Sequence, residues 1–275
     1  MGNRELNLPD FVRPPLIETA IALEFAPLTK FKIPHFGIYW ERIRSEYPEF
    51  DVRPVIQTGL DEVPPGTQIN IEINNDPNAV RCWFMDATKS QLIQVQNNRF
   101  INNWRKLAEA DQYPRYKDKI RPRFKKEWAR FREFVTETEL GELSSVRGEM
   151  TYINHIDFDD GWENYKGISS LFPLWSGKTS AGFLPAPTNV TFAASYPIEG
   201  SKGSLAISLH PVIRLGDQKK ILQLTLVARG RPDSDSDEDI LAWLDLAREW
   251  IVRGFADVTS PKLHAIWERK GSARV

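Results

Sequence analysis

The chain has 275 residues, of which 41% are hydrophobic and 27% are charged, so it can bury a sizeable core and is not a disordered protein. Its 36 basic and 37 acidic residues nearly cancel, which excludes the strongly basic balance of a dedicated nucleic-acid or membrane-surface binder. The single cysteine, Cys82, excludes an intramolecular disulfide and indicates a reducing compartment.

The N-terminal residues contain no apolar segment of the kind that forms a signal peptide. No stretch reaches the roughly 18 consecutive apolar residues of a membrane-spanning helix. The sequence therefore predicts a cytoplasmic protein without membrane association.

The first half of the chain predicts a mixture of strands and helices. Alternating apolar residues predict a strand over 16–25, and apolar residues at three-to-four spacing predict a helix over 35–47, followed by a proline-rich loop to about residue 66. Further strands are predicted over 68–73, 80–86 and 92–104, the last broken at Asn97 and Asn98 as a hairpin. A long helix over 116–139 follows, with Pro122 in its first turn.

The second half repeats this order of elements. A strand over 149–156 is followed by an irregular stretch over 159–187 and then by strands over 189–197, 204–214 and 220–229. An amphipathic helix is predicted over 237–255, and the acidic residues around Ser236 favour its N-terminus. A short strand over 264–267 ends the series.

These elements predict an α+β fold built from two similar halves, 1–145 and 146–275, packed as one compact body. Each half has an antiparallel sheet, made of a leading strand and a three-strand meander, that packs with a long amphipathic helix. Because the halves share little sequence identity, the predicted duplication depends on the order of the elements.

Four phrases occur together in this chain: LPDFVRPPLIETAIALEFAPL near the start, QLIQVQNNRFINNWRK over 91–106, YPRY over 113–116 and EMTYINHI over 149–156. They resemble a sporadically distributed bacterial and archaeal family for which no function is established. The resemblance covers nearly the whole chain and implies no catalytic residue. A sporadic distribution would fit a mobile defence, toxin-neutralising or accessory role.

The segment 99–130 holds eleven basic residues against four acidic ones, Glu109, Asp111, Asp118 and Glu127, a local balance of +7. Basic side chains can contact phosphates, and interleaved aromatic rings can stack on bases. The candidate residues for binding nucleic acid or another partner are Arg99, Trp104, Arg105, Lys106, Tyr113, Arg115, Tyr116 and Lys117. The alternative interpretation, the commoner one for surface helices, is a solvated helix face opposite a buried apolar stripe.

A metal site is the second candidate. In an extended strand end, His155, Asp157 and Asp159 would share one side with Glu149, and this mixture of nitrogen and oxygen ligands suits a divalent ion. The alternative interpretation is a strand that ends in a polar loop, with a histidine that is hydrogen-bonded within the fold.

No phosphate-binding glycine loop, nucleophile elbow or zinc-protease motif occurs, so the sequence predicts neither a catalytic residue nor a cofactor. The leading hypothesis is a non-enzymatic binding protein that recognises a protein partner, because the overall charge is close to zero. The alternative is a nucleic-acid-binding protein, or a metal-dependent enzyme acting on nucleic acid through 99–130, His155 and Asp157. No feature of the sequence specifies an oligomeric state.

Overall fold

The computed structural model describes residues 8–57, 80–157, 165–178 and 182–271, and the chain divides into two compact units. Unit one comprises the described residues of 1–17, 151–229 and 245–275. Unit two comprises those of 18–150 and 230–244.

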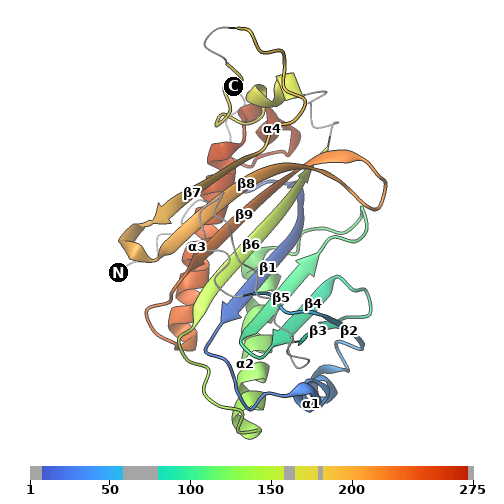
Figure 1. Ribbon diagram of the computed structural model, residues 1–275, viewed down its shortest axis with the longest axis vertical. Helices are drawn as coiled ribbons and strands as arrows, with labels where there is room; N and C mark the ends of the chain where they lie inside the picture. The colour runs from blue at the N-terminus through green and yellow to red at the C-terminus, as the bar shows by residue number, and fades with distance from the viewer. Residues whose placement is uncertain (1–7, 58–79, 158–164, 179–181, 272–275) are drawn as a thin grey trace. The chain divides into compact units, whose positions relative to one another are not determined.

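Unit two contains four whole strands and most of β1, which pair in the order β2-β3-β4-β5-β1 (Figure 1). Their bounds are Leu16–Glu24 for β1, Glu49–Pro54 for β2, Val80–Met85 for β3, Gln91–Gln96 for β4 and Arg99–Arg105 for β5. Each pair is antiparallel, and the predicted break at Asn97 and Asn98 is the turn between β4 and β5.

Two helices accompany this sheet: α1, Ile33–Ile43, and α2, Arg121–Glu137, which continues from a π-helical turn, η2, over Tyr116–Ile120. Pro122 lies in the first turn of α2, as predicted, where a missing backbone N–H costs no helical hydrogen bond. The predicted apolar stripe is buried along its whole length, at Ile120, Phe124, Trp128, Phe131 and Val135.

The core of unit two lies between α2 and one face of the sheet. The ring of Phe100 on β5 lies 5.6 Å from Trp128 and 5.2 Å from Phe131, measured between ring centroids. On α1, Tyr39 packs edge-on against Phe84 and Phe131. Such aromatic pairs add to the stabilisation that comes from buried apolar area. This face of the sheet therefore forms the hydrophobic core of unit two.

Unit one contains the strands β7, Phe192–Ile198, β8, Gly203–Ile213, and β9, Lys220–Gly230, together with most of β6, Arg147–Ile156. It also holds two short 3₁₀ segments, Tyr165–Ser170 and Glu199–Ser201, most of helix α3, Asp237–Val258, and α4, Pro261–Ile266. Gly254 allows α3 to approach Leu205 of β8, since an added Cβ would lie 2.7 Å from that side chain. One face of this sheet is therefore covered by α3.

The strand order over the whole chain is β2-β3-β4-β5-β1-β6-β9-β8-β7, an antiparallel sheet of nine strands. With its helices, this confirms the predicted α+β class. None of the described helices has the length and hydropathy needed to cross a membrane.

Several predicted elements need correction. The segment predicted as a strand over 264–267 belongs mainly to α4, whose start is capped by the Ser260 hydroxyl, with Pro261 in the first turn. The segment predicted as a proline-rich loop contains β2, and α1 ends at Ile43, earlier than predicted. The strand predicted over 68–73 lies outside the described residues.

Candidate functional site

The two faces of the sheet in unit two carry different chemistry. Side chains alternate between faces along a strand, and directly paired residues share a face. Because Phe84 pairs with Ile93 and Phe100 with Val95, these apolar residues lie on the face covered by α2. The opposite face, which we call the polar face, carries Glu18, Glu24, Asp51, Arg53, Arg81, Trp83, Gln94, Gln96, Arg99, Asn103 and Arg105.

Three arginines of the polar face surround one indole ring. The guanidinium carbons of Arg53, Arg81 and Arg105 lie 4.9, 5.6 and 5.4 Å from the ring centroid of Trp83. All three distances are within the range of a cation–π attraction. The indole therefore holds three positive charges close together, and we call these four residues the arginine–tryptophan cluster.

Buried polar atoms without a hydrogen-bond partner gather on the same face. Among the described residues, such atoms include Nε of Arg81, Arg99 and Arg105, Nε1 of Trp83 and Oε1 of Gln94. A buried donor or acceptor without a partner costs about 1–3 kcal/mol, and folded proteins usually avoid it. Five of the ten such atoms found in the described residues lie on this sheet face, and others lie elsewhere, on core residues such as Thr19 and Tyr39.

The positive charge of the cluster is only partly neutralised. Arg53 forms an ion pair with Asp51, whereas no carboxylate among the described residues pairs with Arg81. Burial lowers the pKa of the Arg81 guanidinium, and the nearby charges of Arg99 and Arg53 lower it further. Arg81 is thus a half-buried cation whose charged neighbours repel it.

Amide side chains link the cluster to an acidic residue. Gln94 donates to Oδ1 of Asn103 at 2.8 Å, and Asn103 in turn donates to Oε1 of Glu18 at 2.7 Å. Burial raises the pKa of the Glu18 carboxyl, while the hydrogen bond from Asn103 and the charge of Arg105 lower it. The amides therefore hold Gln94 beside Trp83, its partner across β3 and β4.

Two of the predicted site residues, Arg99 and Arg105, lie on the polar face. Arg99 is buried and donates to Glu24 at 2.7 Å, with Glu149 at 3.9 Å. Arg105 donates from Nη2 to the carbonyl of Lys89 at 2.8 Å and contacts the Met85 sulfur. These contacts fix both guanidinium groups in place.

The other predicted residues do not form one surface. Trp104 and Tyr116 are buried, with 4% and 2% of their surface exposed, so neither ring can stack on a base in this structure. Tyr113 packs edge-on against Trp104, and Arg115 lies over the Tyr113 ring at 5.9 Å. Lys106 is half-buried and Lys117 is exposed.

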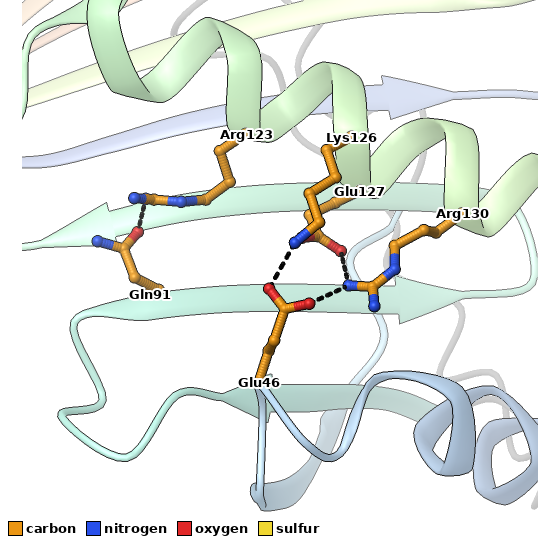
Figure 2. A network of polar contacts seen from close by, with 6 residues as sticks. All are labelled: Glu46, Gln91, Arg123, Lys126, Glu127 and Arg130. Carbon is orange, nitrogen blue, oxygen red and sulfur yellow. Dashed lines mark hydrogen bonds and ion pairs between the residues drawn. The ribbon is translucent and has the colours of Figure 1, made fainter.

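Much of the basic charge on α2 takes part in internal contacts (Figure 2). Glu46, which follows α1, lies 2.6 Å from Nζ of Lys126 and 3.0 Å from Nη1 of Arg130. The same two cations flank the buried carboxylate of Glu127, at 3.8 and 3.2 Å. Arg123 donates to the side-chain oxygen of Gln91 on β4. These contacts favour the interpretation of the basic stretch as part of the packing of α2.

The residues of the predicted metal site are engaged in other contacts. Asp157 receives two bonds from Arg214, at 2.9 and 2.8 Å, and Arg214 also binds Asp217, whose pKa it holds at about 2. Burial lowers the pKa of His155, which hydrogen-bonds Gln223. Asp159 lies outside the described residues, and Glu149 belongs to unit two. In the described part of the chain, no three His, Cys, Asp or Glu residues are grouped to hold a metal ion.

Cys82 is buried on β3, and burial raises the pKa of its thiol to about 11. A thiol with so high a pKa is protonated at neutral pH and is a poor nucleophile. Comparison with known proteins adds no assignment, since neither a family model nor a curated protein sequence matches this chain.

Trp83, Arg81 and Arg53 were not among the residues predicted from sequence. Trp83 lies in the apolar run 82–85, which predicts a buried strand. Because all four residues are apolar, the run does not show which of them lie on which face of the sheet. The signal that could have revealed it is the period of two that places Arg81 on the same face as Trp83.

Proposed function

We propose that this protein is a non-enzymatic binding protein that recognises a protein partner through the polar face of unit two. The observation that carries the proposal is the arginine–tryptophan cluster, in which Arg53 is exposed and Arg81, Trp83 and Arg105 are half-buried, so that cations and an indole ring reach the surface together. Interfaces are also enriched in tryptophan and arginine, which supply much of the energy of hot spots.

A protein partner fits the charges better than a nucleic acid does. The polar face carries Glu18, Glu24 and Asp51 beside its arginines, and Lys126 and Arg130 of α2 are paired with Glu46. A nucleic-acid backbone needs many uncompensated cations for its phosphates. A partner surface of mixed polarity requires only local complementarity.

The test compares three forms of the full chain as bait in an extract of the native cell. The native chain and Arg44→Gln, a change at an exposed arginine outside the polar face, should retain the same protein. The double variant Arg81→Gln, Trp83→Phe should lose it. Equal retention by all three forms would contradict recognition through this face, and retention of nucleic acid instead of protein would favour the alternative.

We further propose that the two halves, 1–145 and 146–275, are an internal duplication. The strand order supports this, because β5 and β9, the last meander strand of each half, lie beside the leading strands β1 and β6. Each half also ends in a long helix, α2 or α3. The family resemblance and the accessory or defence role that it suggests remain proposals of the same kind.

A further inference from the structure

The nine-strand sheet ends in two edge strands, β2 and β7, which differ in their protection. Half of the residues of β2 are charged, and the Asp51 carboxylate already accepts the Val52 N–H at 2.8 Å. Charges on an edge strand oppose pairing with another chain. Strand β7 has no charged side chain among its seven residues. It is therefore the edge that can accept another strand.

Pro197 fixes which backbone groups of β7 face away from its neighbour, β8. Within a sheet, proline occupies positions whose nitrogen points away from the paired strand, because it has no N–H to donate. Pro197 lies directly opposite Ser204 of β8. Because the direction of the backbone groups alternates along an antiparallel strand, those of Ser195 and Ala193 point away from β8 as well. Both residues are exposed, and no loop or turn backbone group in the described residues bonds to them.

The first half of the chain indicates what kind of segment fits beside β7. In the proposed duplication, β3 and β7 correspond, because each is the first strand of a meander, β3-β4-β5 in one half and β7-β8-β9 in the other. The outer edge of β3 pairs antiparallel with β2. No described strand lies in the corresponding position beside β7. An antiparallel strand added at β7 would therefore give the second half the element that the first half has.

We propose that β7 pairs with β7 of a second copy of this chain, antiparallel about a two-fold axis at Ser195. In this register, the two Ser195 residues exchange both of their outward backbone hydrogen bonds, and each Ala193 N–H donates to the Pro197 carbonyl of the other copy. The Ala193 carbonyl, which faces the nitrogen of Pro197, lies at the end of the paired segment, open to water. The outward N–H groups of both strands then have acceptors.

The composition of β7 suits a second copy of the same strand. Pairing about a two-fold axis places the central residue of a strand opposite itself, so a charged residue at the centre meets a like charge. Pairing of β2 about Asp51 would bring two carboxylates together, whereas no register of β7 with itself opposes two charges. Such a contact also closes at two copies, so it covers the open edge without leading to a filament.

The pairing also covers apolar surface on the side of the sheet that α3 covers. Tyr196 lies directly opposite Leu205, which packs beside Gly254 of α3, so the Tyr196 ring lies on that face, where it is half-buried. In the proposed register, Ala194 of one copy lies opposite Tyr196 of the other. Burial of apolar area against the ring would add to the backbone hydrogen bonds.

Sedimentation velocity of the full chain over a range of concentrations tests the proposal. We expect the native chain to be in equilibrium between one and two copies. Ser195→Pro removes the central N–H and keeps the bonds between β7 and β8, so it should weaken dimerisation about tenfold or more. Ser195→Lys, which opposes two like charges, should weaken it several-fold. Ser208→Lys, the same change on the same sheet face but on β8, should leave it within about twofold.

A cysteine cross-link tests the register. At a hydrogen-bonded antiparallel pair the Cα atoms lie about 5.5 Å apart, a separation that a disulfide spans. Ser195→Cys should therefore form a disulfide-linked dimer under mild oxidation, whereas Ser208→Cys should not. The native Cys82 is buried and gives little background. Each variant is first checked for native circular dichroism.

A native chain that stays monomeric up to its solubility limit would overturn the proposal, even if β7 bound a strand of another protein. Dimerisation that folded Ser195 variants do not weaken, or that Ser208→Lys weakens equally, would overturn the assignment to the β7 edge. Absence of the disulfide at residue 195, or equal cross-linking of both cysteine variants, would overturn the register. Strand β7 belongs to unit one, so each of these results leaves the test of the polar face of unit two unchanged.

Discussion

Glu127 is an acidic side chain on α2 with only 1% of its surface exposed. Burial raises the pKa of its carboxyl above the ordinary 4.5, and the nearby cations Arg130 and Lys126 lower it by less. Tyr39, buried on α1, has a raised pKa as well, from burial and from the charge of Glu127. The fold therefore tolerates this carboxylate and does not gain from its charge.

The sign of the pH dependence follows from that direction. The folded state binds the Glu127 proton more tightly than the unfolded state, so this contribution to stability is complete below pH 4.5. It is lost as the pH rises through the raised, folded-state pKa. Glu127→Gln resembles the protonated form, and we expect its melting temperature to equal or exceed that of the native chain at neutral pH.

Thermal unfolding followed by circular dichroism across the acidic to neutral range checks this prediction. The difference between the Gln variant and the native chain should shrink as the pH falls. Glu41→Gln, a change at an exposed residue of α1, is the control and should have little effect. A Gln variant clearly less stable than both other forms at neutral pH would mean that the ion pairs outweigh the burial of charge.

We expect no specific binding of a divalent ion at His155 and Asp157, because Arg214 contacts both carboxylate oxygens of Asp157. Titration calorimetry with Mg²⁺ and Mn²⁺ should give no heat that depends on these residues. If the native chain bound the ion and the double variant His155→Ala, Asp157→Ala did not, the result would support the alternative hypothesis of a metal-dependent enzyme.

Residue types in the sequence could predict burial better than exposure. The regular helical spacing of the stripe from Ile120 to Val135 predicted that it is buried. The aromatic residues Trp104 and Tyr116 were instead predicted as candidates for stacking on bases, although both are buried. Their burial depends on packing under α2 and on Tyr113, which no spacing rule specifies. The opposite error occurs at Trp83. Its apolar neighbours suggest a core residue, but it is only half-buried and lies on the polar face.

Strand β6 approaches an aromatic side chain of α3 at a glycine. An added Cβ at Gly148 would lie 2.4 Å from two ring atoms of Trp243, closer than side chains pack. We expect Gly148→Ala to destabilise the protein by about 1–3 kcal/mol, the usual cost of overpacking. Denaturant unfolding would measure it.

The matched control is Gly37→Ala in α1, where an added Cβ meets nothing within 4 Å. Alanine favours the helix over glycine by about 0.5–1 kcal/mol, so this variant should be slightly more stable. If Gly148→Ala were as stable as the native chain, this result would contradict the close contact between the Trp243 ring and Gly148 of β6.

Elements with a long, regular pattern could be predicted, and short ones could not. The strands β1, β8 and β9 and the helices α2 and α3 follow clear periods in the sequence. Strand β2 is mostly exposed, follows Pro48 and ends at Pro54, so its composition resembles that of a loop. Helix α4 is six residues long, and its capping by Ser260 decides its conformation where the apolar pattern does not.

At the scale of the whole molecule, the near-zero charge is one ground on which we propose a binding protein, and we propose the polar face of unit two as the surface that contacts its partner. Sequence reasoning found Arg99 and Arg105 through their charge. The grouping of Arg53 and Arg105 around Trp83 could not be predicted in this way, because it depends on the register between strands. We therefore still propose a non-enzymatic binding protein, but the candidate binding surface is the polar face and not the basic stretch 99–130.

The most direct test of the central claim uses a photo-cross-linking amino acid at two adjacent positions of β2. Asp51 lies on the polar face, as the cross-strand partner of Trp83, and Val52 lies on the opposite face, as the partner of Cys82. In the native cell, the chain with the cross-linker at position 51 should form a covalent adduct with a protein, and the chain with the cross-linker at position 52 should not. Equal adducts from both positions, or an adduct from position 52 alone, would contradict recognition through the polar face.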